Sequence, residues 1–484
     1  MGYFNYEQLF ISDKLQLLFS SDTNTLEVFY FTYPVLGQVM AIPAGLIDPI
    51  IAPIITSSLF TGFLAAYLVT KLISLDLKFF ACITSAYFIF SPVMIFVAMS
   101  GMTLYLFLIL YFLFFHYVFK YSRDLTTYNF VIISICLSAF VFLDFSFLWI
   151  IVFMIPLVFL FSIYSDPHLK PNFIAIFNQI TLRNDKVKEL IGRFLSSLLV
   201  IIFTPLISLL FYLLINYWFT GQWFYFKNLS TSQWDQKGFL NYTFSNSLIK
   251  ESFTVKYVLK TLFYLSSFLL TALWLGRRRL LFTYSLIMVV LWIIFNKNYD
   301  GTQFFSLNTL LILTASGIAG ILHLFQTSLI DSLKNKTLTS ILISTVFVLT
   351  LTGEVFYFKS TRSALENNMV DFVFQKNANE EMTAFLDMAD FIKTNLNKTD
   401  IILTDNSIFY PVTAMTRTNI SYLDQYNESY YSAIQFPKKF ANYILVSNLE
   451  TEYYTKDQMT AVKLQRESLW YKVYSNDFFT IYKL

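Results

Sequence analysis

Residues 49–73 read PIIAPIITSSLFTGFLAAYLVTKLI, and this run decides the fold class. It holds one charged residue, Lys71, near its end, and it exceeds the roughly twenty apolar residues that a helix needs to cross a bilayer. Similar runs recur along the chain, so the sequence predicts an all-α polytopic membrane domain of about ten helices. We place these helices at residues 49–73, 79–99, 102–119, 129–143, 146–164, 194–216, 257–275, 280–295, 304–326 and 337–358.

The composition agrees with an integral membrane protein. Of the 484 residues, 56% are hydrophobic and 13% are charged, whereas about a quarter of the residues in soluble domains are charged. The net charge of +3 is too small to indicate a nucleic-acid partner. The 3 His and 2 Cys residues form no zinc-ligand spacing and no disulfide framework. We therefore assign no metal ligands and leave a divalent-metal requirement open.

The basic residues of the predicted loops are sorted by side. The loops that follow the odd-numbered spans hold more than twice as many Lys and Arg residues as the other set, and loops rich in Lys and Arg are cytoplasmic. Parity then places residues 1–48 and everything after Phe358 on the outer face. Because a charged N-terminus is hard to translocate, we expect that the start of this chain was assigned one helix too late.

Three regions follow from these patterns. Residues 1–48 form an extracytoplasmic first-loop segment with amphipathic helices, and residues 49–358 form the transmembrane domain with an outer loop at 217–256. Residues 370–484 form a small extracytoplasmic α/β domain. In this last region EEMTAFLDMADFIKTNL has helical spacing, whereas DIILTD, NYILVS, WYKVY and FFTIYKL have the pattern of strands.

Acidic residues near the N-terminus are the candidates for chemistry. The chain lacks glycine-rich phosphate motifs, the G-x-S-x-G motif and the H-E-x-x-H motif of soluble enzymes. A carboxylate on the outer face could act as general base on an acceptor hydroxyl while a lipid phosphate departs. The candidates are Glu7, Asp13, Asp22 and Glu27, and for each of them a solvated loop charge is the alternative interpretation.

The order of features resembles the GT-C superfamily of membrane glycosyltransferases. The acidic segment is followed by YFTYPVLGQVMAIP at the entry to a span, SPVMIFVAMSGM at a hairpin, NYWFTGQWFYFKNLSTSQW in the long outer loop and the terminal α/β domain. More narrowly, this order is similar to bacterial relatives of dolichyl-phosphate-mannose mannosyltransferases and lipid A aminoarabinose transferases. The resemblance implies transfer of a sugar from a polyprenyl-phosphate donor to an outer acceptor, with inversion.

The resemblance also implies a catalytic acid in the first outer loop. The matching stretch here is FNYEQLFISD, so Glu7 is the first candidate for the base and Asp13 the second. Asn5 stands where a second acidic residue is usual. TYPVLG resembles an aromatic-Pro-Pro-Leu element of these enzymes, which assigns Tyr33 and Pro34 to the mouth of the substrate cavity. A proline in the first turn of a helix is the alternative interpretation of Pro34.

Two further clusters are assigned by the same resemblance. FTGQWFYFKN resembles an element in which Asp and Pro stand at the positions of Gln222 and Trp223, and it places Lys227 against a lipid-linked phosphate. NKNYDGTQFF holds a second group at the outer ends of two spans. The implied phosphate contacts are Lys227 and Lys297, and the implied cavity residues are Tyr33, Pro34, Trp223, Trp234 and Asp300. An interfacial aromatic belt is the alternative for the Trp residues.

These interpretations predict a glycosyltransferase of the bacterial inner membrane. Its partners are membrane lipids, a polyprenyl-phosphate sugar donor, and a glycan, lipid or protein acceptor. The alternatives are a transporter or flippase of lipid-linked saccharide and a non-catalytic scaffold of the same fold. Asp48, Asp76 and Asp144 fall at predicted span ends, which disfavours an ion-coupled transporter, since such proteins keep an ionisable residue near mid-membrane.

Overall fold

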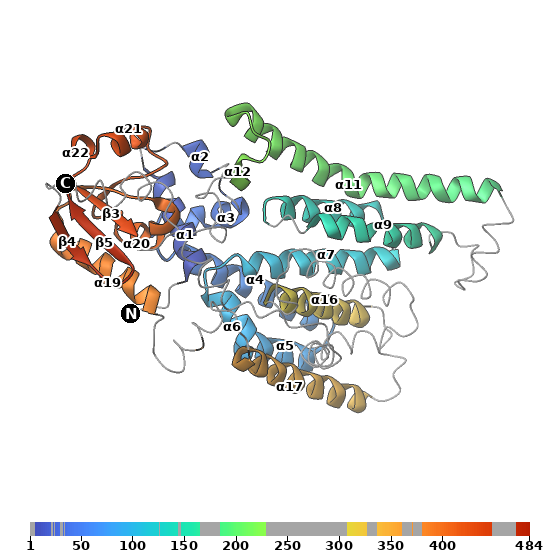
Figure 1. Ribbon diagram of the computed structural model, residues 1–484. Coiled ribbons are helices and arrows are strands. Elements are labelled where there is room, and N and C mark those ends of the chain that lie inside the picture. Colours follow the sequence, from blue (N-terminus) through green and yellow to red (C-terminus); the bar gives the residue numbers. More distant parts are fainter. Residues whose placement is uncertain are drawn as a thin grey trace.

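The computed structural model describes residues 5–20, 23, 25–29, 32, 34–124, 126–143, 147–164, 184–228, 307–326, 336–360, 370, 380–447 and 471–484. Within these ranges the predicted apolar runs are helical, and the helices form an elongated bundle (Figure 1). The bundle contains α4 (Ala52–Ser74), α5 (Lys78–Phe90), α6 (Pro92–Met99), α7 (Leu104–Asp124), α8 (Thr127–Val141), α9 (Phe147–Tyr164), α11 (Asn184–Thr220), α16 (Leu307–Gln326) and α17 (Lys336–Ser360). The short α12 (Tyr225–Asn228) follows α11.

Several of these helices are long and apolar enough to cross a membrane. Among the described residues, 3 helical segments meet this criterion, and they are Ala52–Ser74, Leu104–Tyr121 and Lys188–Thr220. The bent pair α5 and α6 makes a fourth if it counts as one span. Helix α8 and parts of α9 and α16 are shorter apolar helices. The predicted spans at 257–275 and 280–295 lie outside the described residues, so the number ten stays a prediction.

The predicted span at 79–99 is wrong in one respect, because it is not a single helix. Helix α5 ends at Phe90 and α6 begins at Pro92, with a bend of 61° between them. Pro92 has no N–H group, and a proline disfavours helical geometry in the residue before it. Ser91 accordingly has extended backbone angles, with φ −68° and ψ 120°. The chain therefore changes direction inside the bundle.

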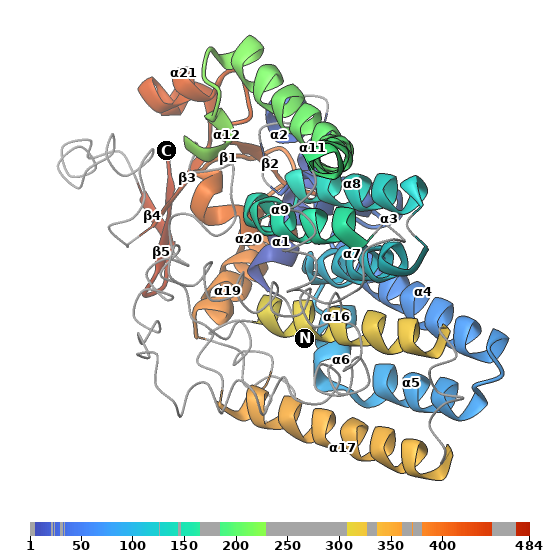
Figure 2. The same cartoon turned by 90° about the vertical axis from the view of Figure 1, so that its right-hand side faces the viewer.

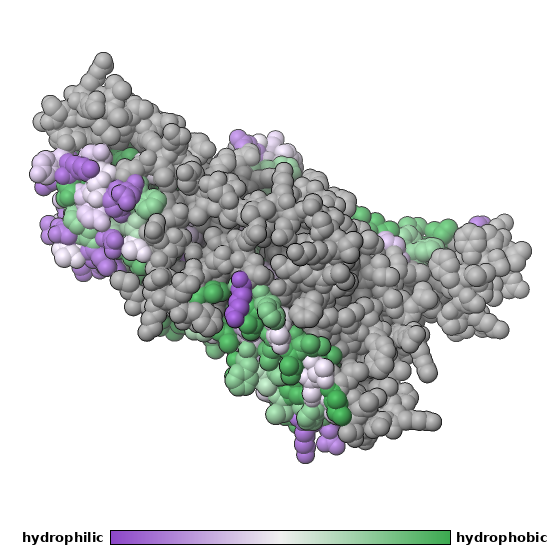
Figure 3. Space-filling model, turned by 60° about the horizontal axis from the view of Figure 1, so that its bottom comes forward, coloured by the Kyte–Doolittle hydropathy of each residue, from purple (hydrophilic) through white to green (hydrophobic). Residues whose placement is uncertain are grey.

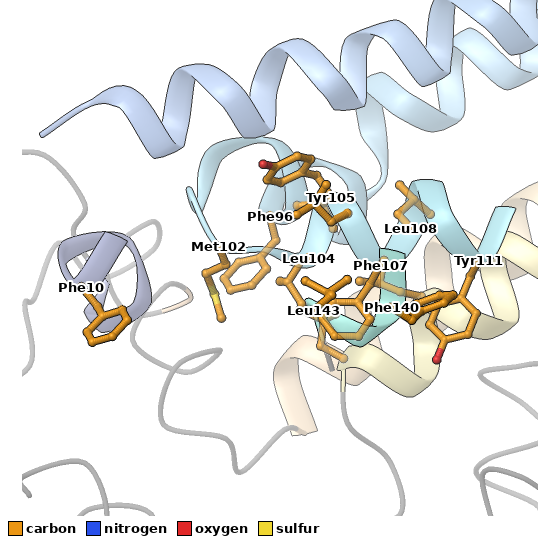
Figure 4. Packing of buried hydrophobic residues seen from close by; sticks show 14 of the residues in the cluster. Phe10, Phe96, Met102, Leu104, Tyr105, Phe107, Leu108, Tyr111, Phe140 and Leu143 are labelled. Carbon is orange, nitrogen blue, oxygen red and sulfur yellow. The ribbon is translucent and has the colours of Figure 1, made fainter. Parts of the chain in front are cut away.

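The two surfaces of the bundle helices differ in what they contact. Inside, α7 packs against α8 and α16. Phe107 and Tyr111 of α7 lie near Phe140 of α8 in the packed interior (Figure 4). On the outside, apolar side chains remain exposed and gather along one face of the bundle (Figure 3). Examples are Phe79, Ile89 and Phe90 on α5 and Val348 and Phe356 on α17, which are each about half exposed or more. Such a surface suits contact with lipid tails.

The C-terminal region is a five-stranded sheet with helices, as its sequence pattern predicted. The strand order is β2-β1-β3-β5-β4, with β1 parallel to β2 and β3, and with β5 antiparallel to β3 and β4. The strands are β1 (Ile401–Leu403), β2 (Ser421–Leu423), β3 (Tyr443–Ser447), β4 (Tyr471–Ser475) and β5 (Phe479–Lys483). The helices are α19 (Glu380–Asn395), α20 (Asn406–Thr416), α21 (Tyr430–Gln435) and α22 (Pro437–Phe440).

The core of this region lies between α19, α20 and β5. The ring of Phe479 lies 4.5 Å from that of Phe385 and 5.3 Å from that of Phe409, measured between centroids. All three side chains are fully buried. Helix α20 lies between the sheet and the N-terminal helix α1 in both views (Figures 1 and 2). The C-terminal region is thus attached to the rest of the molecule through α20.

The N-terminal segment joins the bundle to the C-terminal region. It contains α1 (Tyr6–Leu18), α2 (Thr25–Phe29) and α3 (Val35–Gly45). Asn5 caps α1 by accepting a hydrogen bond from the Gln8 N–H at 2.9 Å. Helix α1 packs against α3 and α4 on one side and against α20 on the other. All of its side chains from Tyr6 to Leu17 are buried, although several of them are polar or charged.

Candidate functional site

Both predicted acids of the first loop lie on α1, and both are buried. Glu7 is 3% exposed and Asp13 is 0% exposed. At 3.6 residues per turn, positions six residues apart point to different sides of a helix. Accordingly, Glu7 contacts the turn before α7, whereas Asp13 contacts α20. Each carboxylate therefore has its own set of partners, and neither is a solvated loop charge.

Glu7 binds the start of α7. Its Oε1 accepts a hydrogen bond from the Thr103 N–H at 2.8 Å and another from the Thr103 hydroxyl. Thr103 immediately precedes α7, so this carboxylate lies where the N–H groups of the first turn favour negative charge. Asn5 adds a hydrogen bond from its side-chain amide to the Ser100 carbonyl. The start of α1 is thereby tied to the turn that joins α6 and α7.

Asp13 is surrounded by four hydrogen-bond donors. Its Oδ1 lies 2.6 Å from the Thr413 hydroxyl and 3.4 Å from Arg417 Nη2. Its Oδ2 lies 2.9 Å from Asn406 Nδ2 and 3.3 Å from Lys14 Nζ. Burial opposes ionisation, but the charges of Lys14 and Arg417 and the two neutral donors outweigh it and lower the pKa of Asp13. Asp13 is therefore an ionised acceptor in a closed site.

The charges around Asp13 are balanced within the network. Arg417 Nη2 also lies 2.6 Å from Asp424 Oδ2, so each of the two cations has an anion beside it. Lys14 donates to Asn406 Oδ1 at 2.6 Å, and its Nζ lies 4.2 Å from the centroid of the Tyr426 ring. We call Asp13, Lys14, Asn406, Thr413, Arg417 and Asp424 the α1–α20 polar network. A buried network of this kind holds its elements in one relative position, provided that its members are paired.

Glu27 on α2 is a third acidic residue at this end of the molecule. Its Oε1 accepts a long hydrogen bond of 3.5 Å from the Tyr225 hydroxyl of α12. Burial raises the pKa of Glu27 and the charge of Asp424 adds to this effect, whereas the Tyr225 hydrogen bond and the charge of Lys14 oppose it. The net pKa is raised, and the side chain is only partly buried. A partly exposed carboxyl with a raised pKa suits a proton acceptor.

The other predicted site residues are placed as follows. Pro34 is buried and occupies the N-cap position of α3, directly before its first turn. Trp223 is 43% exposed and stacks on Tyr217, with 4.7 Å between the ring centroids. Lys227 lies in α12, but its side chain is outside the described residues. Also outside them are Asp22, Tyr33, Trp234, Lys297 and Asp300.

Sequence reasoning missed most of the α1–α20 polar network. Asn406 lies 393 positions from Asp13 in the chain, so no local spacing connects them. The one local signal is the Asp-Asn-Ser sequence at 405–407, which is typical of a helix start, and Asp405 caps α20 by accepting from the Ser407 N–H at 2.9 Å. Among the residues that the structure describes, no group of 3 or more His, Cys, Asp or Glu side chains is placed to hold a metal ion.

Comparison with known proteins identifies the fold. No family model matches the sequence. No curated protein matches it either. The similar solved structures include ArnT from Cupriavidus metallidurans in the apo state and the same protein bound to undecaprenyl phosphate. Each has a TM-score of 0.50 and 11% sequence identity, and each alignment covers 99% of this chain and 93% of the other.

This likeness concerns the fold, because the sequences are only 11% identical. The chain therefore has an ArnT-like fold of the GT-C kind, as the order of its features predicted. The mostly helical architecture and the small C-terminal sheet agree with that fold. Together with the helices of membrane-spanning length, the fold identifies an integral membrane protein.

Proposed function

We propose that this protein moves a sugar from a polyprenyl-phosphate-linked donor to an acceptor on the outer face of the bacterial inner membrane. The observation that carries the proposal is the fold likeness over 99% of the chain to ArnT, one structure of which is bound to undecaprenyl phosphate. The acceptor is a hydroxyl group of a glycan, a lipid or a protein.

The proposed reaction is an inverting displacement. A carboxylate accepts the proton of the acceptor hydroxyl, and the acceptor oxygen attacks the anomeric carbon of the sugar. The bond between that carbon and the phosphate oxygen breaks, and the polyprenyl phosphate leaves with its bonding electrons. No bond to phosphorus forms or breaks in this step, so the main demands on the protein are proton acceptance and fixation of the two substrates.

Three acidic residues are proposed for different parts of this task. Glu7 stays the first candidate for the base, on the resemblance of its sequence segment to the catalytic loop. Asp13 was the second, but its four donors and lowered pKa suit a positioning anion better than a proton acceptor. Glu27 is a further candidate for the base, because it is partly exposed and has a raised pKa.

The donor is proposed to lie beside α12 and the loop that follows it. Tyr225 of α12 reaches Glu27, so this loop begins next to the acidic N-terminal segment. Lys227 and Lys297 are the proposed phosphate contacts. The proposed cavity residues are Tyr33, Pro34, Trp223, Trp234 and Asp300.

The orientation is proposed from the two ends of α11. Lys188 and Arg193 lie near its start, whereas exposed Trp218 and Phe219 lie near its end. Basic residues favour the cytoplasmic side, and Trp favours the headgroup layer. The C-terminal sheet lies at the same end of the molecule as the C-terminal end of α11 (Figure 1). We therefore place residues 1–48 and 370–484 on the periplasmic side.

Full-length protein in lipid vesicles with a panel of polyprenyl-phosphate sugars tests the function. We expect release of polyprenyl phosphate and formation of a new glycosidic bond, detected by mass spectrometry, with and without a chelator of divalent metals. Glu7→Gln and Glu27→Gln are compared with Asp13→Asn, and the variant that loses turnover but keeps donor binding identifies the base. Movement of the donor between leaflets without a new bond would show a flippase instead.

A further inference from the structure

A buried acidic residue in the bundle has no part in the reaction as proposed so far. Glu354 lies on α17 and is 2% exposed. Its Oε1 accepts a hydrogen bond from the Tyr87 hydroxyl at 2.7 Å, and its Oε2 accepts one from the Ser91 hydroxyl. The backbone of Val93 also hydrogen-bonds to this carboxyl group. The acidic residues identified from the sequence lie in the first loop or at span ends, so Glu354, within the predicted span 337–358, was missed.

The partners of Glu354 all belong to the break between α5 and α6. Tyr87 lies in the last turn of α5, Ser91 is the N-cap of α6, and Val93 lies in the first turn of α6. A helix start leaves N–H groups without partners, and inside an apolar bundle no water replaces them. The Ser91 hydroxyl accepts from the Met94 N–H at 3.1 Å, and the Glu354 carboxyl group accepts from the Val93 backbone. Two side chains thus satisfy this helix start.

The break is connected to the candidate site by one short helix. Helix α6 ends at Met99, and the turn that follows contains Ser100, Gly101 and Thr103. That turn binds α1 through the Asn5–Ser100 and Glu7–Thr103 hydrogen bonds. Phe96 of α6 and Met102 of the turn lie in the packed interior together with Phe10 of α1 (Figure 4).

We propose that Glu354 is a positioning residue that fixes the bend between α5 and α6 and thereby holds the 100–103 turn against Glu7. The contact of α17 with α6 is reinforced by Phe358, whose ring centroid lies 5.9 Å from that of Phe96. A carboxyl group suits this task because its two oxygens accept from the Tyr87 and Ser91 hydroxyls and from the Val93 backbone. The effect on catalysis rests on the proposed function, but the effect on the turn does not.

Amide hydrogen exchange of the full-length protein in nanodiscs tests the positioning step. In Glu354→Gln and Tyr87→Phe we expect exchange in peptides covering 100–108 and 5–12 to rise about tenfold, the size expected from losing a buried hydrogen bond. Peptides from α19 and β5 should not change. Thr352→Ala is the control, since its exposed side chain lies on the same helix and donates only to Val348 within that helix.

Exchange that stays unchanged at 100–108 in both variants would overturn the proposal, and so would an equal rise in every peptide, which indicates general destabilisation. In the transfer assay we expect both variants to lower kcat more than they raise KM. If the wild type transfers no sugar but the variants still loosen the 100–108 turn, then the proposed function fails and the positioning role stands.

Discussion

At the scale of single residues, Asp13 is the anion that joins α1 to α20. In Asp13→Asn, Lys14 and Arg417 lose the charge between them while they remain buried. Removing one partner of a buried ion pair typically costs about 3–5 kcal/mol, so we expect the free energy of unfolding to fall by about that amount. Chemical unfolding in detergent measures the change. Glu189→Gln, which removes an exposed pair with Arg193, should cost only about 0.3–0.5 kcal/mol.

The α1–α20 polar network also predicts a pH dependence. The pKa of Asp13 is lowered in the folded protein, so its stabilisation is complete above its ordinary value of 3.8 and is lost as the pH falls through the folded value. The pKa of Lys14 is raised, so its stabilisation is complete below 10.5 and is lost as the pH rises through the folded value. We expect the difference in unfolding free energy between wild type and Asp13→Asn to stay constant between roughly pH 5 and 9. A steady decline of this difference across the neutral range would contradict the assignment.

If Glu27 is the base, its pKa sets the acid limb of the pH profile of the transfer reaction. Its pKa is raised above the ordinary 4.5, so activity should fall as the pH drops through a value above 4.5. The Tyr225 hydrogen bond lowers this pKa, so Tyr225→Phe should move the limb to still higher pH, while Glu27→Gln should remove turnover. The pH profile of kcat/KM measures both. If Tyr225→Phe leaves the acid limb at the same pH, Glu7 is favoured as the base.

At this scale the sequence identified acidic residues but not their partners. Glu7 and Asp13 stood out because an N-terminal segment of a membrane protein carried charge. Their burial could not be predicted, because it depends on Thr103 and on residues such as Asn406 and Arg417 from the far end of the chain. The pairing of Lys14 with a neutralising network likewise has no local sequence signal.

At the scale of elements, Gly101 is the position where the turn before α7 requires glycine. Its φ is +67°, and an added Cβ would lie 3.0 Å from the Gln8 side chain and 3.1 Å from the Ile54 backbone nitrogen. We expect Gly101→Ala to lower the free energy of unfolding by about 1–3 kcal/mol and to displace α1, because both strain and a backbone clash oppose it. Thermal unfolding and hydrogen exchange at residues 5–12 measure these effects.

Two other glycines separate the effect of backbone strain from that of the clash. Gly221 has φ +72° but nothing within 4 Å of an added Cβ, so Gly221→Ala should show the strain alone. Gly62 lies inside α4 with open space around it, and Gly62→Ala should be neutral or stabilising by up to about 1 kcal/mol. An equal loss at Gly62 and Gly101 would contradict the proposed role of the turn.

Apolar runs predicted the helices more closely than they predicted their shape. The run at 79–99 coincides with α5 and α6, and the run at 304–326 with α16, to within a few residues. The bend was not predicted, although Pro92 was visible, because a proline inside an apolar run either kinks a helix or ends it. Here the Ser91 cap and Glu354 complete the break, and Glu354 lies 263 positions from Ser91.

At the scale of the whole molecule, the orientation is open to a direct test. With Cys82→Ser and Cys136→Ser as background, single cysteines are introduced at the exposed positions Glu428 and Glu189. In intact cells a membrane-impermeant thiol reagent should label Glu428→Cys, in the C-terminal region, and not Glu189→Cys, near the start of α11. After permeabilisation both should react. Labelling only of Glu189→Cys in intact cells would reverse the assignment.

The overall arrangement was predictable in outline from the order of features along the chain. The helical bundle, the small C-terminal sheet and the GT-C-like fold agree with that order. The burial of α1 could not be predicted. Its charged residues are compatible with a packed interior only when residues of α20 pair with them.

The long separation in sequence between Asp13 and its partners on α20 also sets the order of assembly during synthesis. Asn406 follows Asp13 by 393 residues, and a chain that grows at about 5–20 residues per second needs roughly 20 to 80 seconds to cover that interval. During this time Asp13 and Lys14 are without the partners that α20 supplies, so α1 stays in water or among lipid headgroups. The candidate site is therefore completed last, and a ribosome that stalls before residue 406 leaves a membrane bundle without it.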